Sequence, residues 1–405
     1  MPQRKVSGSK QAVIVEAVRT PCGKRNGKLK DMHPTELAAA VLKEVVRRAG
    51  IEPAMVDDIV MGCVLPAGDQ GLNIARNSAL LAGFPVEVPA TTVDRQCGSS
   101  QQSAHFAAQG VMAGAYDIVV AAGVEVMSMV PMGSSFMTPN TGMPFGPAMM
   151  ARYEDRGGLV PQGTSAEMIA EKWNLSREDL DAYGARSQQF AARAREEGRF
   201  EREILPVQAR PVDKDTGKLI ETDEILSADE GIRPDTTVET LANLKPAFKP
   251  DGVVTAGNSS QITDGASALL IMSEAKANEL GMTPRARFHS FALAGVDPIF
   301  MLTGPLPATE KVLERSGLTM DDIDLVEINE AFASVVLAWE KELHPDMDKV
   351  NVNGGAIALG HPLGCSGARL MTTLLHELER TGGRYGLQTM CEGGGLANAT
   401  IIERL

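Results

Sequence analysis

Short apolar runs alternate with amphipathic stretches along the first 130 residues of the chain. The apolar runs lie at 12–21, 57–62 and 117–123, and the helical patterns lie at 35–48, 71–82 and 97–110. In the first helical pattern, the apolar residues Leu37, Val41, Leu42 and Val45 fall on one face. Strands that alternate with helices predict an α/β fold whose parallel or mixed sheet is covered on both faces.

The same order of elements returns in the C-terminal half. Helical patterns at 308–317, 331–343 and 361–380 alternate with apolar runs at 321–328, 387–390 and 399–402. Cys97 lies 39 residues after Asp58, and His361 lies 37 residues after Asp324. Two similar modules that place Cys97 and His361 at matching positions predict an internal duplication.

Composition changes between the two modules. Residues 127–163 are rich in Met, Gly and Pro with little periodicity, which predicts loops, and 165–200 has a charged helical pattern. A polar stretch with several prolines follows before an apolar strand resumes at 268–272. We therefore expect an N-terminal half formed by 1–128 and 264–282, an inserted loop domain at 129–263, and a C-terminal half at 283–405.

Charge and cysteine content narrow the function classes. The net charge of −13 argues against sequence-independent nucleic-acid binding, so an anionic substrate would need a local basic patch. The five cysteines are odd in number and widely scattered, which is typical of a reducing compartment, and their spacing predicts no metal site. We find no signal peptide, membrane span or peroxisomal address, and we expect a cytoplasmic protein.

Cys97 stands between a β-prone stretch and the start of a helical pattern. A strand-to-helix turn can present a nucleophile, and helix N-terminal amides lower the pKa of a thiol. The alternative is a buried structural cysteine, since free cysteine is among the most buried residue types. The two interpretations are about equally supported by this pattern alone.

Three further positions have the residue types that proton transfer and oxyanion binding need. His361 lies in a tight loop of small residues and has the chemistry of a general base. Cys391 is followed, after Glu392, by three glycines that begin at Gly393. Their backbone N–H groups are not shielded by side chains and can bind an oxyanion. Asn329 lies at a predicted strand-to-helix junction, where a simple N-cap is the favoured interpretation.

The motifs around these residues together resemble the thiolase family over the full length of the chain. They are Cys97-Gly98-Ser99, Asn329-Glu330-Ala331-Phe332-Ala333, Gly360-His361-Pro362 with Gly364, Ser366 and Gly367, and Cys391 with Gly393-Gly394-Gly395, joined by Gln70–Arg76 and Thr255–Ser260. The resemblance implies a duplicated α-β-α-β-α layered fold with an inserted loop domain. It also implies an acyltransferase that cleaves a 3-ketoacyl-coenzyme A.

The resemblance assigns a role to each candidate residue. His361 takes the proton of Cys97, whose thiolate attacks the 3-keto carbonyl, and Cys391 protonates the acetyl-coenzyme A enolate. The N–H groups of Cys97 and Gly393 form one oxyanion site, and His361 with a water on Asn329 forms the other.

Coenzyme A is expected as a substrate, together with acyl-coenzyme A, and no permanently bound cofactor is expected. By motif alignment its contacts are Arg233, Thr240, Leu244, Phe248, Ala256 and Ser260. Family resemblance also implies a homodimer or homotetramer that binds neither nucleic acid nor membrane.

The chain departs from the family pattern at two places. Acetoacetyl-specific thiolases often have His-Met before Gly-x-Thr-Ala-Glu, where this chain has Pro161-Gln162 before Gly163. We therefore expect a longer or bulkier acyl group, as in bacterial fatty-acid or steroid side-chain degradation. The second departure is Glu392, which we expect to face away from Cys391.

Three other functions compete with degradative thiolysis. The closest is a biosynthetic thiolase that condenses two acetyl-coenzyme A molecules into acetoacetyl-coenzyme A, because the reaction is reversible. A ketosynthase-type condensing enzyme would need a second histidine where this chain has Cys391. A scaffold without catalytic activity would not need all four catalytic residue types.

Overall fold

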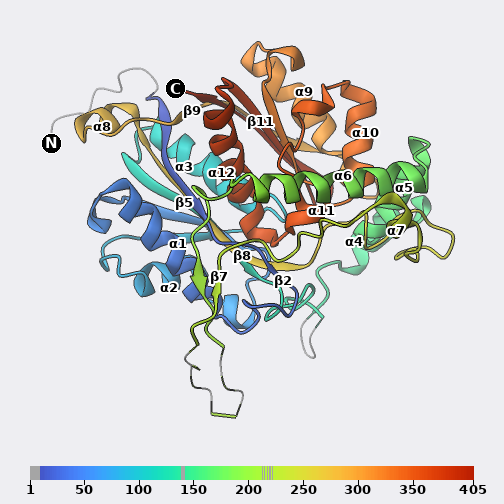
Figure 1. Ribbon diagram of the computed structural model, residues 1–405, viewed down its shortest axis with the longest axis horizontal. Helices are drawn as coiled ribbons and strands as arrows, with labels where there is room; N and C mark the ends of the chain where they lie inside the picture. The colour runs from blue at the N-terminus through green and yellow to red at the C-terminus, as the bar shows by residue number, and fades with distance from the viewer. Residues whose placement is uncertain are drawn as a thin grey trace.

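The computed structural model describes residues 10–137, 142–211, 213, 215–216, 218, 220 and 222–405. Its main feature is one continuous mixed sheet that runs through the molecule in the order β10-β11-β12-β9-β1-β8-β5-β3-β4 (Figure 1). The short strand β2 (Gly23–Lys24) pairs with β8 outside this order. The α/β architecture predicted from the alternating pattern is therefore confirmed.

The N-terminal half of the sheet combines parallel and antiparallel pairs. It consists of β1 (Ala12–Arg19), β8 (Thr263–Ser273), β5 (Ile118–Val126), β3 (Asp58–Gly62) and β4 (Ala90–Val93). Strand β3 runs parallel to β4 and β5, and β8 is antiparallel to β5 and β1. Every residue of β5 and β8 is buried, as expected for strands covered on both faces.

The C-terminal half repeats this arrangement. It consists of β10 (Leu325–Ile328), β11 (Tyr385–Glu392), β12 (Leu396–Arg404) and β9 (Ala286–Gly295). Strand β10 is parallel to β11, while β12 is antiparallel to β11 and β9. Thus β3, β5, β8 and β1 correspond to β10, β11, β12 and β9. The halves meet where Val13 and Ile14 of β1 pair with β9.

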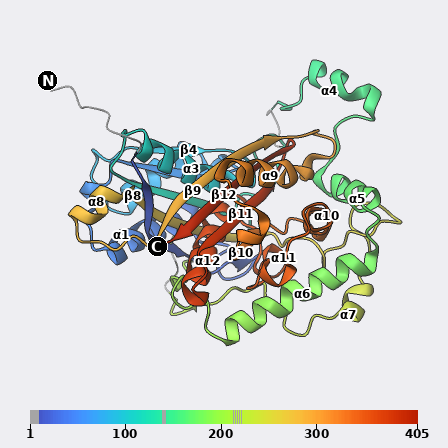
Figure 2. The ribbon, with the colours of Figure 1, turned by 90° about the horizontal axis from the view of Figure 1, so that it is seen from above.

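Helices cover the outer faces of the two halves of the sheet, and two further helices lie between the halves. Helices α3 (Ser99–Met112) and α12 (Leu363–Thr381) pack on each other, and α12 contacts strands of both halves. Outside them, α1 (Pro34–Ala49) and α2 (Ile74–Leu81) cover the N-terminal half. Helices α9 (Pro305–Ser316) and α10 (Ala333–Leu343) cover the C-terminal half. The α-β-α-β-α layers implied by the resemblance are present (Figure 2).

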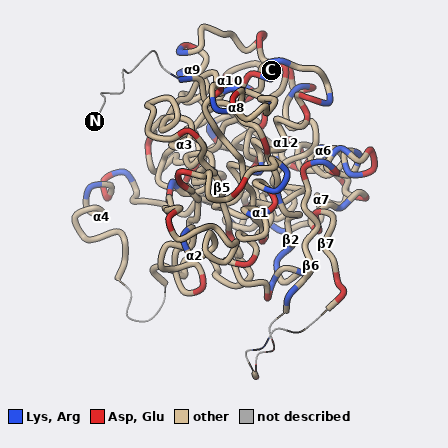
Figure 3. Tube along the Cα trace, turned by 90° about the vertical axis from the view of Figure 1, so that its left-hand side faces the viewer, with Lys and Arg blue, Asp and Glu red and all other residues tan. Residues whose placement is uncertain are grey.

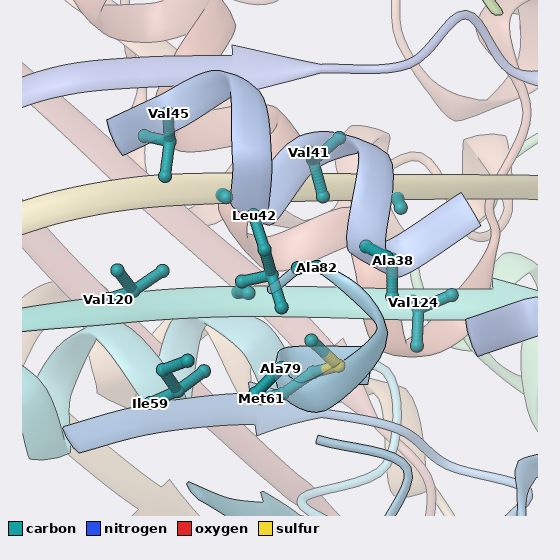
Figure 4. Close-up of a cluster of buried hydrophobic side chains, with 14 of the residues drawn as sticks. Ala38, Val41, Leu42, Val45, Ile59, Met61, Ala79, Ala82, Val120 and Val124 are labelled. Carbon is teal, nitrogen blue, oxygen red and sulfur yellow. The ribbon is translucent and has the colours of Figure 1, made fainter. Parts of the chain in front are cut away.

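The outer N-terminal layer shows why these residues form these elements. Ala38, Leu42 and Val45 of α1 recur at helical spacing and point at the sheet, where Ile59 and Val120 meet them (Figure 4). Both sets are fully or almost fully buried, so the apolar face of the helix and the strand residues exclude water together.

The excursion between β5 and β8 contains more helix than its composition predicts. It includes α4 (Pro147–Tyr153), α5 (Gln162–Lys172), α6 (Arg177–Glu196) and α7 (Val238–Ala242), with the two-stranded sheet β6 (Val207–Gln208) and β7 (Ile225–Leu226). Loops alone were predicted for 127–163, but α4 forms there and stands away from the body (Figure 2). The helical pattern at 165–200 divides into α5 and α6, because Ser176 caps a second helix with a capping box.

Short elements complete the C-terminal part. Helix α8 (Glu274–Glu279) follows β8, and α11 (Ala356–Leu359) precedes the His361 loop. Single 3₁₀ turns lie at Pro53–Met55, Gly68–Gln70, Glu154–Arg156, Met301–Thr303, Met320–Asp322 and Met347–Lys349.

Charges of both signs are mixed over the outer helices and loops (Figure 3). Within the described ranges, no helix is long and apolar enough to cross a membrane. The same residues contain no group of three or more His, Cys, Asp or Glu side chains arranged to hold a metal ion. All five cysteines are free and buried.

Candidate active site

Cys97 lies in a tight turn between β4 and α3. The residue before it, Gln96, has a φ of 48°, a left-handed conformation that non-glycine residues rarely adopt. The Ser99 hydroxyl fixes the turn, because it accepts from the Arg95 N–H at 2.9 Å and donates to the Gln96 carbonyl at 2.6 Å. Helix α3 begins at Ser99 rather than at Cys97, with Gly98 as its N-cap. The turn therefore presents the thiol ahead of the helix.

Three N–H groups lower the pKa of the Cys97 thiol. They are the backbone N–H groups of Gly393 and of Cys97 itself, and the side-chain amide of Gln162. Burial nevertheless raises the pKa of Cys97 to about 12, and the nearby Glu392 carboxyl adds to this shift. The expectation of a lowered thiol pKa is therefore wrong, because desolvation outweighs the donors. A thiol in this environment needs a base to remove its proton.

His361 is held in one tautomer by its neighbours. Its backbone N–H donates to the Gln261 carbonyl at 3.0 Å, and its Nδ1 lies 2.6 Å from Ser366 Oγ. The Ser366 hydroxyl donates to the Pro362 carbonyl at 2.9 Å, so it accepts from His361 Nδ1–H. This hydrogen-bond pattern assigns the lone pair to Nε2, 3.4 Å from Asn329 Nδ2.

The imidazole of His361 is neutral over the ordinary pH range. Burial lowers its pKa to about 3, and the charge of Arg369 on α12 contributes in the same direction. The sequence suggested a histidine that titrates near neutrality, and the structure corrects this, because the side chain is almost wholly inaccessible to water. A neutral Nε2 is available to accept a proton.

Asn329 follows β10 and contacts two of the other motifs. Its N–H donates to the Thr389 carbonyl at 3.0 Å, and its side chain reaches His361. Its Oδ1 has no hydrogen-bond partner among the described protein atoms. The N-cap of α10 is Phe332, so the simple capping role that the sequence favoured for Asn329 is wrong.

The loop that carries Asn329 is anchored by the buried carboxylate of Glu330. This carboxylate accepts from the Tyr183 hydroxyl at 3.0 Å and the Ser187 hydroxyl at 2.6 Å. It also accepts from Asn351 Nδ2 at 3.0 Å and from the Ile357 N–H at 3.1 Å. Four partners on other elements hold the loop in place.

Cys391 lies inside β11, opposite Ala397 of β12, and is fully buried. Burial raises the pKa of its thiol well above the ordinary value, and ionisation of Cys97 or Glu392 would raise it further. Beyond the strand, Gly394 and Gly395 have φ values of 81° and 80°, which favour glycine and turn the chain back into β12.

Glu392 points inward, contrary to our expectation. Its carboxyl lies against Gly98 of the Cys97 turn, where an added Cβ would clash with Oε1. The side chain is fully buried, and neither oxygen has a hydrogen-bond partner in the described part of the chain. Burial raises the pKa of Glu392 to about 8, and the nearby Arg95 opposes this. The sequence offered no signal for it beyond the unusual residue type beside Cys391.

The four motifs converge through a chain of contacts. Cys97 packs with Leu370 of α12 and Met390 of β11, which bring the His361 helix and the Cys391 strand to it. The Gly393 N–H lowers the pKa of Cys97, and Asn329 joins His361 to β11. The Cys97 thiol, the neutral His361 imidazole, the Cys391 thiol and the Asn329 amide are thus brought together at the carboxyl ends of β4, β10 and β11.

Two of the residues aligned with coenzyme A contacts, Phe248 and Leu244, pack against glycines of the excursion between β5 and β8. Phe248 is 46% exposed, rests on Gly163 and packs edge-on against Phe332, with ring centroids 5.8 Å apart. Leu244 packs on Gly257.

The other four aligned positions differ in exposure. Arg233, Thr240 and Ala256 are exposed, and Thr240 belongs to the capping box of α7. Ser260 is half-buried, and its N–H donates to Ala331 in the Asn329 loop at 2.9 Å.

The sequence analysis did not assign two residues that touch the candidate catalytic groups. Ser366 was quoted in the His361 motif without a role, although its spacing one helical turn after His361 and Pro362 could have indicated the contact. Gln162 was noted as a departure from the family pattern and related only to the acyl group. Its effect on the pKa of Cys97 depends on how α5 packs, which the local sequence does not determine.

Comparison with known proteins places the chain in a family. The thiolase N-terminal domain matches residues 12–275, and the thiolase C-terminal domain matches 282–404. A steroid 3-ketoacyl-CoA thiolase of Mycobacterium tuberculosis is 50% identical, over 98% of this chain and 94% of the relative. A 3-ketoacyl-CoA thiolase of Bacillus subtilis is 46% identical, over 97% and 99%.

A solved structure agrees with these sequence relatives. The crystal structure of the Bacillus anthracis acetyl-CoA acetyltransferase superposes with a TM-score of 0.88 at 42% identity, covering 98% of this chain and all of the other. Two family domains that together cover nearly the whole chain, relatives of about half identity and a shared fold lead to one conclusion: the chain belongs to the thiolase family.

Proposed function

We propose that the chain cleaves a 3-ketoacyl-coenzyme A with free coenzyme A, giving acetyl-coenzyme A and an acyl-coenzyme A shortened by two carbons. The observation that supports this proposal is the convergence of the segments that carry Cys97, His361, Asn329 and Cys391, with the Gly393 N–H acting on Cys97. The names of the relatives, which include 3-ketoacyl-CoA thiolases of two different bacteria, support the same reaction.

In the first half-reaction, His361 Nε2 removes the Cys97 proton as the sulfur attacks the 3-keto carbon. The carbonyl oxygen becomes negatively charged, and the N–H groups of Cys97 and Gly393 stabilise it. When the bond between C2 and C3 breaks, the oxygen returns to a carbonyl in the acyl-cysteine thioester. The electron pair moves into the acetyl-coenzyme A enolate, which takes a proton from Cys391.

In the second half-reaction, free coenzyme A attacks the acyl group on Cys97. The Cys391 thiolate left by the first step accepts the coenzyme A thiol proton, and Cys97 leaves and regains its proton from His361. The cycle therefore ends with both thiols protonated and the imidazole neutral. The enolate oxygen binds to His361 and to a water on Asn329, whose Oδ1 has no protein partner to compete for that water.

Coenzyme A enters along the loop domain in this proposal. Leu244, Phe248 and Ala256 are exposed apolar residues. Exposure of apolar side chains to water is unfavourable, and a bound ligand that covered them would remove this cost. Phe248 contacts Gly163, the neighbour of Gln162, whose amide lowers the pKa of Cys97, so we place the acyl end of the ligand near Cys97. Arg233 is assigned to the phosphate end of the ligand, and Thr240 and Ser260 are assigned to polar contacts with it.

The physiological direction in this proposal is degradation of a fatty-acid or steroid side chain. The relatives of about half identity are named as 3-ketoacyl-CoA thiolases, one of them as a steroid enzyme. Gln162 in place of methionine supports an acyl group longer than acetoacetyl. These observations make condensation of two acetyl-coenzyme A molecules the less favoured direction.

We further propose that the protein forms a homodimer or homotetramer in the cytoplasm. Strand β4 is an edge of the main sheet, and it lies beside α2, whose flanks carry exposed apolar residues. Leu72 is 94% exposed and Val86 is 70% exposed, so a second copy at this edge would remove apolar surface from water. The five free cysteines support a reducing compartment.

Acyl labelling tests the central step. Native enzyme given an acyl-coenzyme A should carry the acyl group on Cys97, and Cys97→Ala should abolish both label and turnover. His361→Ala should lose most thiolysis while its circular dichroism is unchanged. Label on Cys365 or Cys63 instead, or near-normal turnover of either variant, would remove the residue concerned from the mechanism.

A substrate panel tests the substrate class. Thiolysis is followed by the loss of 3-ketoacyl absorbance for acetoacetyl, longer fatty-acyl and steroid side-chain substrates, each with free coenzyme A. We expect kcat/KM to be higher for the long or steroid substrates than for acetoacetyl-coenzyme A. The opposite order would favour the condensing enzyme.

A further inference from the structure

Glu125 is a buried carboxylate that the proposed mechanism does not use. It lies near the end of β5, is wholly inaccessible to water and accepts from four N–H groups. Its Oε2 accepts from the Val64 and Gly364 backbone N–H groups, each at 2.9 Å. Its Oε1 accepts from Gln70 Nε2 at 2.5 Å and from the Leu65 N–H at 3.3 Å. One side chain therefore joins the segment after β3 to the start of α12.

The donors decide the form of this side chain. An ionised carboxylate only accepts hydrogen bonds, so all four N–H groups match it, whereas a protonated acid would need an acceptor of its own. Burial raises the pKa of Glu125, and the same four donors oppose this shift. Glu125 therefore acts as an acceptor at both oxygens.

The Gly364 N–H belongs to the first turn of α12, which begins just after His361. N–H groups of the first turn have no partner within a helix and need one from outside it. The N-cap of α12 is Pro362, whose side chain makes no capping hydrogen bond. Glu125 supplies the acceptor from β5, and the positive end of the helix dipole favours a carboxylate there. The N-terminal half of the fold therefore caps the helix that follows His361.

The start of α12 also lies in direct contact with the N-terminal half. A Cβ added at Gly364 would lie 2.7 Å from the Cys63 α-carbon, just after β3, so only glycine allows this approach. The Ser100 hydroxyl at the start of α3 accepts from the Ala368 N–H of α12 at 2.8 Å. The first turns of α12 are thus fixed against both β3 and the helix that follows Cys97.

We propose that Glu125 is a positioning residue that caps α12 and thereby fixes His361 against the half of the fold that contains Cys97. Movement of the first turn of α12 would carry His361 with it, because Pro362 alone separates the two. The Ser366 hydroxyl that accepts from His361 Nδ1 lies in the same turn, so the orientation of the imidazole depends on the same cap. This inference rests on the proposed thiolase function, in which His361 removes the Cys97 proton.

Replacing Glu125 by methionine removes both acceptor oxygens and keeps a similar length. The Gly364 N–H then has no partner, so kcat for thiolysis should fall by about ten- to a hundredfold, since a misplacement of about 1 Å can cost about a hundredfold. KM for free coenzyme A should be unchanged, because the proposed coenzyme A contacts lie on other elements.

Glu125→Gln is the conservative variant. Its carbonyl oxygen can accept from the Gly364 N–H while its NH₂ group faces Gln70, so kcat should lie between the values of Glu125→Met and the native enzyme. A role in filling buried space alone would favour methionine over glutamine. The order of the two variants therefore distinguishes positioning from packing.

Hydrogen exchange measures the cap without any turnover. Amide exchange of the peptide 360–368, read by mass spectrometry, should be faster in Glu125→Met than in the native enzyme and intermediate in Glu125→Gln. The control Glu377→Gln changes another buried carboxylate, which lies on α12 and accepts from Asn353 Nδ2 at 3.1 Å and Arg380 Nε at 2.8 Å. It should leave kcat and the exchange of 360–368 at native values.

The outcomes separate the inference from the proposed function. Native kcat or native exchange at 360–368 in a folded Glu125→Met would overturn the role of Glu125, as would a kcat in Glu125→Gln no higher than in Glu125→Met. If circular dichroism shows that Glu125→Met does not fold, native kcat and exchange in Glu125→Gln would overturn it. Faster exchange in both variants, combined with a native enzyme that cleaves no 3-ketoacyl-coenzyme A, would support the cap and reject the thiolase function.

Discussion

Replacing Glu392 by glutamine should make the protein more stable in alkaline solution. Glu392 is fully buried against Gly98, and neither carboxyl oxygen has a partner among the described residues. Burial raises its pKa from the ordinary 4.5 to about 8. The folded chain therefore keeps a proton that the unfolded chain releases over this pH interval.

The magnitude follows from the difference between the two pKa values. Below about pH 4.5 both states hold the proton, so Glu392 causes no loss of stability there. As the pH rises to about 8, only the unfolded state ionises, and the free energy of unfolding falls by up to about 5 kcal/mol. Above about pH 8 both states are ionised and the loss is complete. Glutamine does not titrate, so Glu392→Gln should lack this loss.

Urea unfolding, followed by the fluorescence of Trp173 and Trp339, measures the effect at pH values below 5 and near 9. Both proteins are kept at one concentration, because an oligomer's stability depends on it. The control Glu196→Gln removes an exposed carboxyl and should unfold with the native pH dependence. If the native protein and Glu392→Gln differed by less than about 1 kcal/mol across this range, Glu392 would not be a buried, protonated acid.

Three other substitutions test individual contacts, two of them at the site and one at a buried ion pair elsewhere in the fold. Gly98→Ala places a methyl group against the Glu392 carboxyl, so it should lower the free energy of unfolding in urea by about 1–3 kcal/mol. Adding Glu392→Ala should recover part of this loss, and no recovery would contradict the contact. Ser366→Ala removes the acceptor that fixes the His361 tautomer. The kcat of thiolysis should fall about tenfold or more with unchanged KM, which is part of the roughly 10²–10⁴-fold acceleration that general base catalysis supplies. A native kcat would refute the tautomer assignment. Arg19→Met leaves the buried carboxylates of Glu203 and Asp229 without their cation, so it should lower the free energy of unfolding by about 3–5 kcal/mol. A native urea midpoint would show that the two ion pairs contribute little.

The parts of the fold that local patterns determine could be predicted from the sequence. Leu42 on α1 and Val120 on β5 belong to periodic apolar patterns, and these patterns gave the order of the elements and the duplication. Helix starts were misplaced by about two residues, as at Ser99, because Gly98 rather than Cys97 occupies the cap. Helix α4 was missed because its seven residues are largely exposed and have no buried face.

The electrostatic state of the site could not be read from residue types. Cys97 at a turn before a helix suggests an acidic thiol, and His361 suggests a base that titrates near neutrality. Both inferences assume access to water, and the fold removes it. The orientation of Glu392 depends on how β11 packs against the Cys97 turn, which brings together residues almost 300 positions apart. Long-range packing decides such features, and a sequence pattern reports only local preference.

The pKa shifts of the four groups all favour the uncharged form, because the acids are raised and the imidazole is lowered. Near neutral pH, Cys97 and Glu392 keep their protons and His361 has none, so each is uncharged before substrate binds. Cys391 is also a neutral thiol, because its pKa lies well above the ordinary value. A dry site without charge carries little penalty for burial, whereas a permanent thiolate would have to be desolvated in the resting enzyme. In the proposed mechanism, charge arises only during the reaction, on the Cys97 sulfur and on the carbonyl oxygen, next to the N–H of Gly393. Because water is excluded there, the N–H groups of Cys97 and Gly393 stabilise the new charge more than they could at the surface. Burial that opposes ionisation in the resting protein can therefore still serve catalysis.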